Sequence, residues 1–446
     1  MDTHTDPARG EAPWPAPTLA WWAVAVLLVA YTVSFIDRMI LSLLVAPIRA
    51  DLQISDFEFS ILHGLAFAAF YTLMGLPLGY LADRANRQRI ISIGIAFWSV
   101  MTALCGLAPT YAALFLARLG VGVGEAALSP AAYSMLSDYF PKHRLGRAMA
   151  VYSIGVPLGS GIALIVGGLV VKFATQSPAP VLPVLGETEP WRLVFFMVGL
   201  PGLLVALLML SVREPARRGG EGVRAEKFGA VFAYVGARWR AYGGHFLGLS
   251  LLTFVIYGGL AWYPTFFART YGMAPADAGM IFGVIMAAGG AAGLILGGVL
   301  ADLLFRKGLR SGHLIAVIIA VASSAPFFVA APLMASPVGA FALLAPAVLL
   351  SSMHGGVAGA ALQLITPNAF RGQVTALYFF MANLIGLGLG PMAVAALNDF
   401  LFRDDAMLRY AMAIVAACAL PLSALVLWSG LGAFARAVAA QDAQAR

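Results

Sequence analysis

Hydrophobic stretches long enough to cross a membrane recur along the whole chain, and short polar segments separate them. A hydrocarbon core about 30 Å thick requires about 20 apolar residues in helical form. The candidate spans are residues 19–47, 57–82, 90–108, 110–138, 147–173, 191–212, 243–268, 276–301, 312–333, 338–365, 372–398 and 407–434. The pattern therefore predicts an all-α membrane protein with twelve transmembrane helices.

The two halves of the chain repeat a short motif. The segment from Gly79 to Arg87 reads GYLADRANR, and the segment from Gly298 to Arg306 reads GVLADLLFR. Internal repeats of this kind are typical of transporters built from two helical halves, so we expect two six-helix bundles. The predicted parts are a tail of residues 1–18, a first bundle of residues 19–212, a basic linker of residues 213–242, a second bundle of residues 243–434 and a tail of residues 435–446.

The composition indicates which side of the membrane each loop faces. The chain is 61% hydrophobic and 11% charged, whereas a soluble domain is about 25% charged. The net charge of +7 comes from Lys and Arg clustered in alternate short loops, which follows the positive-inside rule and does not indicate a nucleic-acid partner. The intervening loops carry acids such as Asp51, Asp56, Asp404 and Asp405. We therefore expect both tails and the linker on the cytoplasmic side of a plasma membrane, the inner membrane in a bacterium.

Four formal charges lie at membrane depth in the first half: Asp37, Arg38, Arg118 and Glu125. Each would cost roughly 2.5–3.5 kcal/mol at the centre of a helix unless it faces a partner or a watery cavity. Adjacent residues project about 100° apart, and residues seven apart are separated by about 10.5 Å along the axis. Neither pair can therefore neutralise itself within its own helix, and the partners must come from another helix.

Several segments resemble one transporter family. The stretch from Gly75 to Arg89, with its degenerate copy at residues 294–306, looks like the signature loop of the major facilitator superfamily. Within that superfamily, SFIDR ending at Arg38 and ARLGVGVGEA ending at Ala126 resemble the spinster-like branch, as do Trp191-Arg192 and Arg213-Glu-Pro215. The animal members of that branch export sphingosine phosphate or move lysophospholipids. The anion:cation symporter branch, which imports organic acids and sugar acids with protons, is similar in its first and fourth spans and is the alternative.

The resemblance implies a central cavity lined by the first and fourth spans. An arginine exchanged between two carboxylates could load and release a proton, so we expect Asp37, Glu125 and Arg118 to couple proton movement. The alternative is a static charge network that holds the two spans together. Substrate-binding candidates are Arg38, Arg118 and Glu125 with the deeper residues Phe254, Tyr257, Tyr378, Phe379 and Asn383, although those aromatics could equally pack against lipid.

A second set of charges lies at the cytoplasmic edge of the predicted spans. The resemblance implies that carboxylates there hold the ends of helices and favour one closed state. The gating candidates are Asp83, Arg84, Arg87, Asp138, Asp302 and Arg306. The alternative is that these arginines only determine topology.

The sequence favours secondary active transport over other functions. It contains no Ser/His/Asp arrangement, metal-ligand spacing or phosphate loop, so no enzyme activity and no cofactor or metal is expected. Nothing resembles the filter loop or the ring of acids of a channel, and no segment reads as the output domain of a sensor. We expect a monomer in the lipid bilayer that moves a small amphipathic substrate, a lysophospholipid or sphingoid phosphate, together with protons. The alternative substrate is an organic anion or sugar acid.

Overall fold

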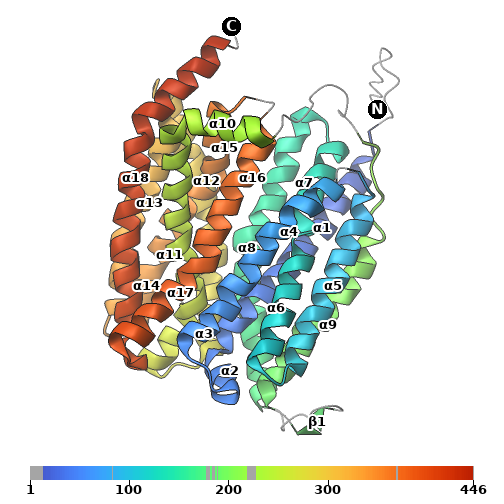
Figure 1. The fold of residues 1–446 in the computed structure, drawn as a ribbon, viewed down its shortest axis with the longest axis vertical. Coiled ribbons are helices and arrows are strands. Elements are labelled where there is room, and N and C mark those ends of the chain that lie inside the picture. The colour runs from blue at the N-terminus through green and yellow to red at the C-terminus, as the bar shows by residue number, and fades with distance from the viewer. Residues whose placement is uncertain are drawn as a thin grey trace.

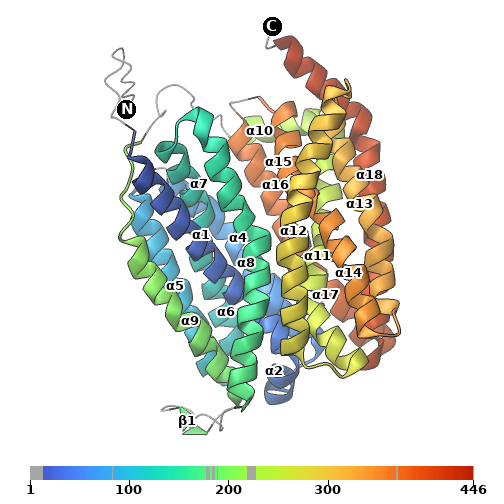
Figure 2. The same ribbon diagram turned by 180° about the vertical axis from the view of Figure 1, so that it is seen from behind.

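The computed structural model describes residues 14–82, 84–176, 181–182, 186–187, 189–217, 228–367 and 370–444. Twelve of its helical segments are long and apolar enough to cross a membrane. Figures 1 and 2 show them as two side-by-side bundles, the first coloured blue to green and the second yellow-green to red. The predicted all-α fold with two six-helix bundles is therefore confirmed.

The first bundle contains the helices up to α9. These are α1 (Pro17–Met39), α2 (Val45–Leu52), α3 (Asp56–Ser60), α4 (Ala66–Ala82), α5 (Arg87–Leu107), α6 (Tyr111–Glu125), α7 (Leu128–Tyr139), α8 (Lys142–Gln176) and α9 (Pro190–Met209). A 3-10 segment (Ile40–Leu43) follows α1, and a π segment (Ile61–Leu65) joins α3 to α4. Before α9, the two short strands β1 (Val181–Leu182) and β2 (Gly186–Glu187) pair antiparallel.

The second half begins with α10 (Phe228–Ala237), which lies within the segment predicted as a linker. It continues through α11 (Trp239–Tyr271), α12 (Pro275–Arg306), α13 (Gly312–Ala330), α14 (Pro337–Ser352), α15 (His354–Ile365), α16 (Arg371–Met381), α17 (Gly390–Ala396) and α18 (Leu408–Gln444). A 3-10 segment (Ala331–Leu333) ends α13, π segments (Ala382–Leu389 and Leu397–Phe402) flank α17, and a 3-10 turn (Asp405–Met407) precedes α18.

Helix α18 continues into the segment expected to be a tail. The reason is local, because this stretch is rich in alanine, the residue with the highest helix propensity. The predicted tail of residues 1–13 lies outside the described residues.

The molecule has two distinct ends along the helix axes. The start of α1, the end of α18 and α10 lie at one end, here called the terminal end, and α2, α3 and the β1–β2 pair lie at the other, here called the distal end (Figure 1). Two spans are interrupted beside the predicted intramembrane charges: α1 tightens into a 3-10 segment shortly after Arg38, and α6 ends at Glu125. Mid-helix 3-10 turns often mark hinges, so the charges lie where the helices are least regular.

The two bundles touch closely where α8 crosses α12. A Cβ atom placed on Gly161 would lie 2.4 Å from the carbonyl oxygen of Gly283, and one on Gly283 would lie 2.6 Å from the carbonyl oxygen of Gly161. Only residues without side chains permit this approach of two backbones. Gly161 and Gly283 therefore contribute directly to the contact between bundles.

We expect Gly161→Ala to force α8 and α12 apart and to lower the thermal midpoint in detergent by several degrees, because overpacking a tight contact costs about 1–3 kcal/mol. Differential scanning fluorimetry measures the midpoint. The control is Gly359→Ala on α15, where an added methyl meets no atom within 4 Å. If the two substitutions have the same effect, the close crossing contributes nothing to stability.

Candidate functional site

The first functional feature is an ion pair at membrane depth. The Nε atom of Arg38 donates a hydrogen bond to Oε2 of Glu125 at 2.6 Å, and both side chains are buried. The rings of Phe35, Phe67 and Tyr71 lie 5.2, 4.8 and 4.8 Å from the guanidinium carbon. Aromatic faces at this range stabilise a desolvated cation. The charge of Arg38 is therefore matched by one carboxylate and by rings from α1 and α4.

Asp37 and Arg118 are neighbours but do not form an ion pair. Nη1 of Arg118 donates to the backbone carbonyl oxygen of Asp37 at 3.3 Å, and the Nε of Arg118 has no partner among the described residues. Asp37 is 0% exposed, and neither of its carboxylate oxygens has a hydrogen-bond partner within the described chain. The buried indole of Trp98 is near this carboxylate but does not meet hydrogen-bond geometry. Asp37 is thus a buried acid without a regular donor.

Both bundles contribute to the surroundings of this charge cluster, defined as Asp37, Arg38, Arg118 and Glu125. Tyr257 of α11 packs against the hydrophobic core of the first bundle and is close enough to interact electrostatically with Arg38. His63 is buried near Arg118. The part of the chain that the structure describes contains no group of three His, Cys, Asp or Glu residues able to hold a metal ion.

The other predicted substrate residues are spread over the second bundle. Tyr378 packs against His245, at 5.3 Å between ring centroids. Asn383 is half-buried in the π segment after α16, Phe379 is 49% exposed, and Phe254 lines an apolar furrow on the second bundle. Of the predicted aromatics, only Tyr257 lies beside the charge cluster. Phe67 and Tyr71 were missed, although their i, i+4 spacing on one helix face was a readable signal.

The terminal end carries a network within the first bundle. Arg87, at the start of α5, binds Asp138 of α7 at 2.5 Å and Glu214 at 2.7 Å. Glu214 also accepts from the backbone N–H of Gln88 at 3.0 Å. These contacts hold α5, α7 and the segment after α9 together. Glu214 was missed as a site residue, although it lies in a stretch that carried the family resemblance.

The remaining gating candidates make no ion pair between bundles within the described chain. Asp83 lies outside the described residues. Arg84 stacks on Tyr80 with 3.6 Å between the guanidinium carbon and the ring centroid, and Asp302 and Arg306 are exposed on α12. Among the described residues, the terminal end therefore has no ion pair that joins the two bundles.

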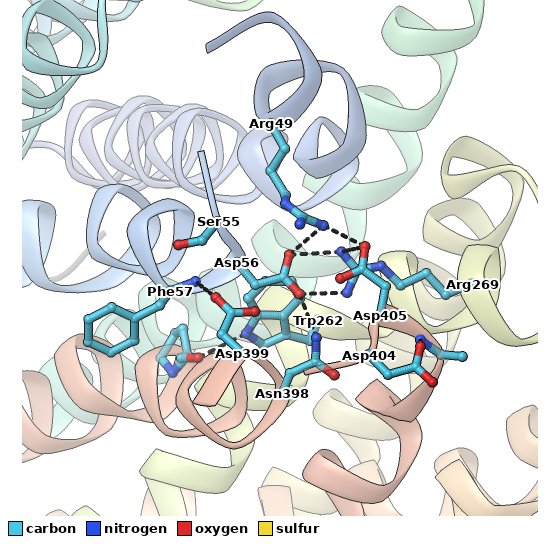
Figure 3. Close-up of polar contacts among 12 residues, drawn as sticks. Arg49, Ser55, Asp56, Phe57, Trp262, Arg269, Asn398, Asp399, Asp404 and Asp405 are labelled. Atoms are coloured by element: carbon cyan, nitrogen blue, oxygen red, sulfur yellow. Dashed lines mark hydrogen bonds and ion pairs between the residues drawn. The ribbon is translucent and has the colours of Figure 1, made fainter. Parts of the chain in front are cut away.

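The distal end does have such a contact, here called the distal network (Figure 3). Arg269 of α11 donates to both carboxylate oxygens of Asp56 at 2.6 and 2.8 Å. Arg49 of α2 reaches Asp56 at 2.9 Å and Asp405 at 2.8 Å. Asn398 donates to Asp56 at 3.0 Å. The buried Asp56 of the first bundle thus binds directly to two elements of the second, and Arg49 adds a bridge to Asp405.

Charge balance in the distal network favours the ionised state of Arg49. Burial alone would lower the pKa of the Arg49 guanidinium, but its hydrogen bond to Asp405 and the charge of Asp56 outweigh burial and raise that pKa. Phe57 adds a backbone contact across the bundles by donating to the Asp399 carboxylate at 2.7 Å.

The distal network was not predicted as a site, because its acids were used only as topology markers. Arg49 and Arg269 gave a readable signal, since they lie on the side that the positive-inside rule depletes of cations.

Comparison with known proteins establishes the family. The family model described as Major Facilitator Superfamily matches residues 27–391. The chain belongs to the Major Facilitator Superfamily. This member is similar to an MFS-type efflux pump of Mycolicibacterium smegmatis, 29% identical over 427 residues that cover 92% of each chain. It is 24% identical to protein spinster of Drosophila melanogaster over 395 residues, 86% of this chain but 62% of that protein.

Two further known proteins are similar to this chain over most of its length. The probable L-galactonate transporter of Escherichia coli is 24% identical over 84% of this chain and 83% of its own length. The crystal structure of a bacterial homolog to human lysosomal transporter Spinster, inward-facing and unoccupied, matches with a TM-score of 0.77 at 28% identity, over 95% of this chain and 98% of that chain. The chain is therefore a spinster-like transporter and not an enzyme, as predicted.

The distal network joins the two bundles of this superfamily member at the distal end. Removing one partner of a buried ion pair costs at most about 3–5 kcal/mol. The cost of losing Asp56 is lower than this limit, because Arg49 and Arg269 also pair with Asp405 at 2.8 and 3.3 Å. An energy of that size is enough to shift a two-state conformational equilibrium.

We therefore expect Asp56→Asn to open the distal end in a large fraction of molecules, because Arg49 and Arg269 lose their shared carboxylate. Spin labels on cysteines at Ala50 and Leu401, both exposed on opposite bundles, report the separation by double electron–electron resonance in a background without Cys418. The control is Asp404→Asn, because Asp404 caps the N–H of Ala406 and forms no ion pair among the described residues. Equal distance distributions in both variants would contradict the gating role of Asp56.

Proposed function

We propose that the chain moves an amphipathic anion, a lysophospholipid or sphingoid phosphate, by proton-coupled alternating access. Its place would be the bacterial inner membrane, as a monomer with both termini in the cytoplasm. The distribution of basic loops supports this orientation. The observation that carries the proposal is the pair of buried neighbours Asp37 and Arg118, which are close but not bonded through their charges.

Asp37 is the proposed proton site. An ionised carboxylate buried without donors is costly, so this arrangement favours the neutral, protonated acid. Arg38 is already engaged by Glu125, whereas Arg118 makes no ion pair among the described residues. Loss of the proton would turn Asp37 into a carboxylate beside Arg118, which already donates to the Asp37 backbone. Protonation of Asp37 therefore frees Arg118, and deprotonation recruits it.

Arg118 is the proposed anchor for the anionic group of the substrate. Arg–phosphate contacts away from bulk water are strong and can be bidentate. When Asp37 is protonated, Arg118 can bind the substrate anion. When Asp37 is ionised, its carboxylate and the phosphate of the substrate compete for the Arg118 guanidinium. Proton binding and anion binding therefore reinforce each other. The rings of Phe67, Tyr71 and Tyr257 offer apolar surface beside the charges for the lipid-like part.

The alternative substrate is a sugar acid or other small organic anion. The similarity to the probable L-galactonate transporter of Escherichia coli supports it. A carboxylate could bind Arg118 as a phosphate does, so the charge cluster serves either class. The spinster relatives and the aromatic surroundings favour the amphipathic one.

Flux measurements separate the two substrate classes. We expect purified protein in liposomes to move labelled lysophosphatidate or sphingosine phosphate, faster with an imposed pH gradient than without one. Labelled L-galactonate, tested in parallel, should move no faster than in empty liposomes. Uptake of L-galactonate without movement of either lipid would establish the alternative.

We expect Asp37→Asn to abolish accumulation driven by a pH gradient and to leave substrate exchange at equal pH intact, because asparagine imitates the protonated acid. Parallel flux assays in liposomes measure both activities. The control, Asp277→Asn, removes an exposed carboxylate that pairs with Lys172 at 3.4 Å and should retain both. If Asp37→Asn instead unfolds at a lower temperature and loses both activities together, the cluster is a static structural network.

A further inference from the structure

A basic cavity lies at the terminal end of the second bundle, away from the charge cluster. Its volume is about 300 Å³, and it opens between the start of α11 and the last turns of α18. Three arginines line it, namely Arg238, Arg240 and Arg436, together with Trp239. Its apolar wall consists of alanines such as Ala241 and Ala437. Three cations around one small apolar recess form an arrangement suited to an anion with an apolar body.

The three guanidinium groups make no ion pair within the described residues. Arg238 lies over the ring of Tyr234 at 4.0 Å, and Arg240 lies over the ring of Trp239 at 5.5 Å. A guanidinium stacked on a ring keeps its N–H groups pointing outward in the plane and loses little entropy when it binds a phosphate. The cavity therefore presents ordered donors and a net positive charge.

Helix α10 fixes one wall of the cavity. It lies across the terminal end of the second bundle (Figure 1). Its Tyr234 stacks on Phe370 at 4.9 Å between centroids, and the Tyr234 hydroxyl accepts from Gln441 of α18 at 3.3 Å. Val231, also on α10, is buried. Tyr234 thus ties α10, which ends beside Arg238, to α18 and to the residue before α16.

The cavity adjoins the lipid-facing side of α18. Leu425 is 67% exposed and lies eleven residues before Arg436, which on an ideal helix is about 16 Å along the axis and about 20° around it. A cation at the end of a membrane helix above an exposed apolar face matches a phospholipid, with the head group at the cavity and the acyl chains along the helix. The exposed Trp239 is the residue type that marks this interfacial depth.

We propose that this cavity binds an acidic phospholipid through its phosphodiester, with Arg238, Arg240 and Arg436 as donors. Phosphatidylglycerol represents the class. Basic pockets between helices on the positive side of a membrane bind such head groups, and the apolar wall of alanines explains why a lipid is preferred to free phosphate. The bound lipid would link α10, and with it the connection between bundles, to α18. This site is separate from the transported substrate, so it does not depend on the proposed function.

Thermal shift assays on the purified full chain test the assignment. Phosphatidylglycerol in mixed micelles should raise the midpoint by several degrees, whereas phosphatidylcholine and inorganic phosphate at matched concentrations should leave it unchanged. Arg240→Gln combined with Arg436→Gln should weaken the apparent affinity for phosphatidylglycerol at least about tenfold, equivalent to about 1.4 kcal/mol. The control is Lys307→Gln with Arg310→Gln, which removes the same charge from exposed positions outside the cavity.

Native mass spectrometry provides a second measurement that does not depend on the baseline stability of the variants. We expect the wild type and the control variant to retain bound phosphatidylglycerol under activation that strips it from the arginine variant. Equal retention by all three proteins would overturn the assignment of the cavity. An equal midpoint shift from inorganic phosphate would also overturn it, because the site would then recognise free phosphate and not a lipid.

Discussion

The ion pair between Arg38 and Glu125 determines which of the four buried charges in the first bundle remain without an ionic partner. A lone charge at membrane depth is expensive, and this pair matches one cation to one carboxylate between α1 and α6. It leaves Asp37 and Arg118 as the second pair, held near each other by the bond from Arg118 to the Asp37 backbone. Arg38 and Glu125 are therefore paired with each other, whereas Asp37 and Arg118 are the two residues that we propose for proton and anion binding.

The charge cluster and the distal network share the same structural elements. The run from α1 through its 3-10 segment to α2 carries Arg38 at one end and Arg49 at the other. Helix α11 carries Tyr257 beside Arg38 and Arg269 in the distal network, twelve residues or about 18 Å further along. The two elements that carry residues of the charge cluster therefore also carry residues of the distal network. We propose that a change of charge at the cluster reaches the distal network through these shared elements.

The sequence predicted the fold well because the constraints that a membrane imposes on a helix act within each span. Each span must satisfy its backbone within one apolar stretch, so length and hydropathy alone located the twelve helices. The central charges were found for the same reason, because Asp37 and Glu125 are conspicuous in apolar surroundings. What the sequence could not reveal was the pairing, since Arg38 and Glu125 are 87 residues apart along the chain. The distal network was hidden because Asp56 and Arg269 meet only when two bundles pack.

We propose that proton and substrate binding meet at Asp37 and Arg118. The most direct test is the exchange of protons with the medium when substrate binds to purified protein in weakly buffered solution, followed with a pH indicator. At a pH where Asp37 of the substrate-free wild type is partly ionised, linkage predicts that binding of the anionic substrate takes up protons, whereas Asp37→Asn binds substrate without taking up any. Equal proton uptake by both proteins, or none by the wild type, would contradict the account.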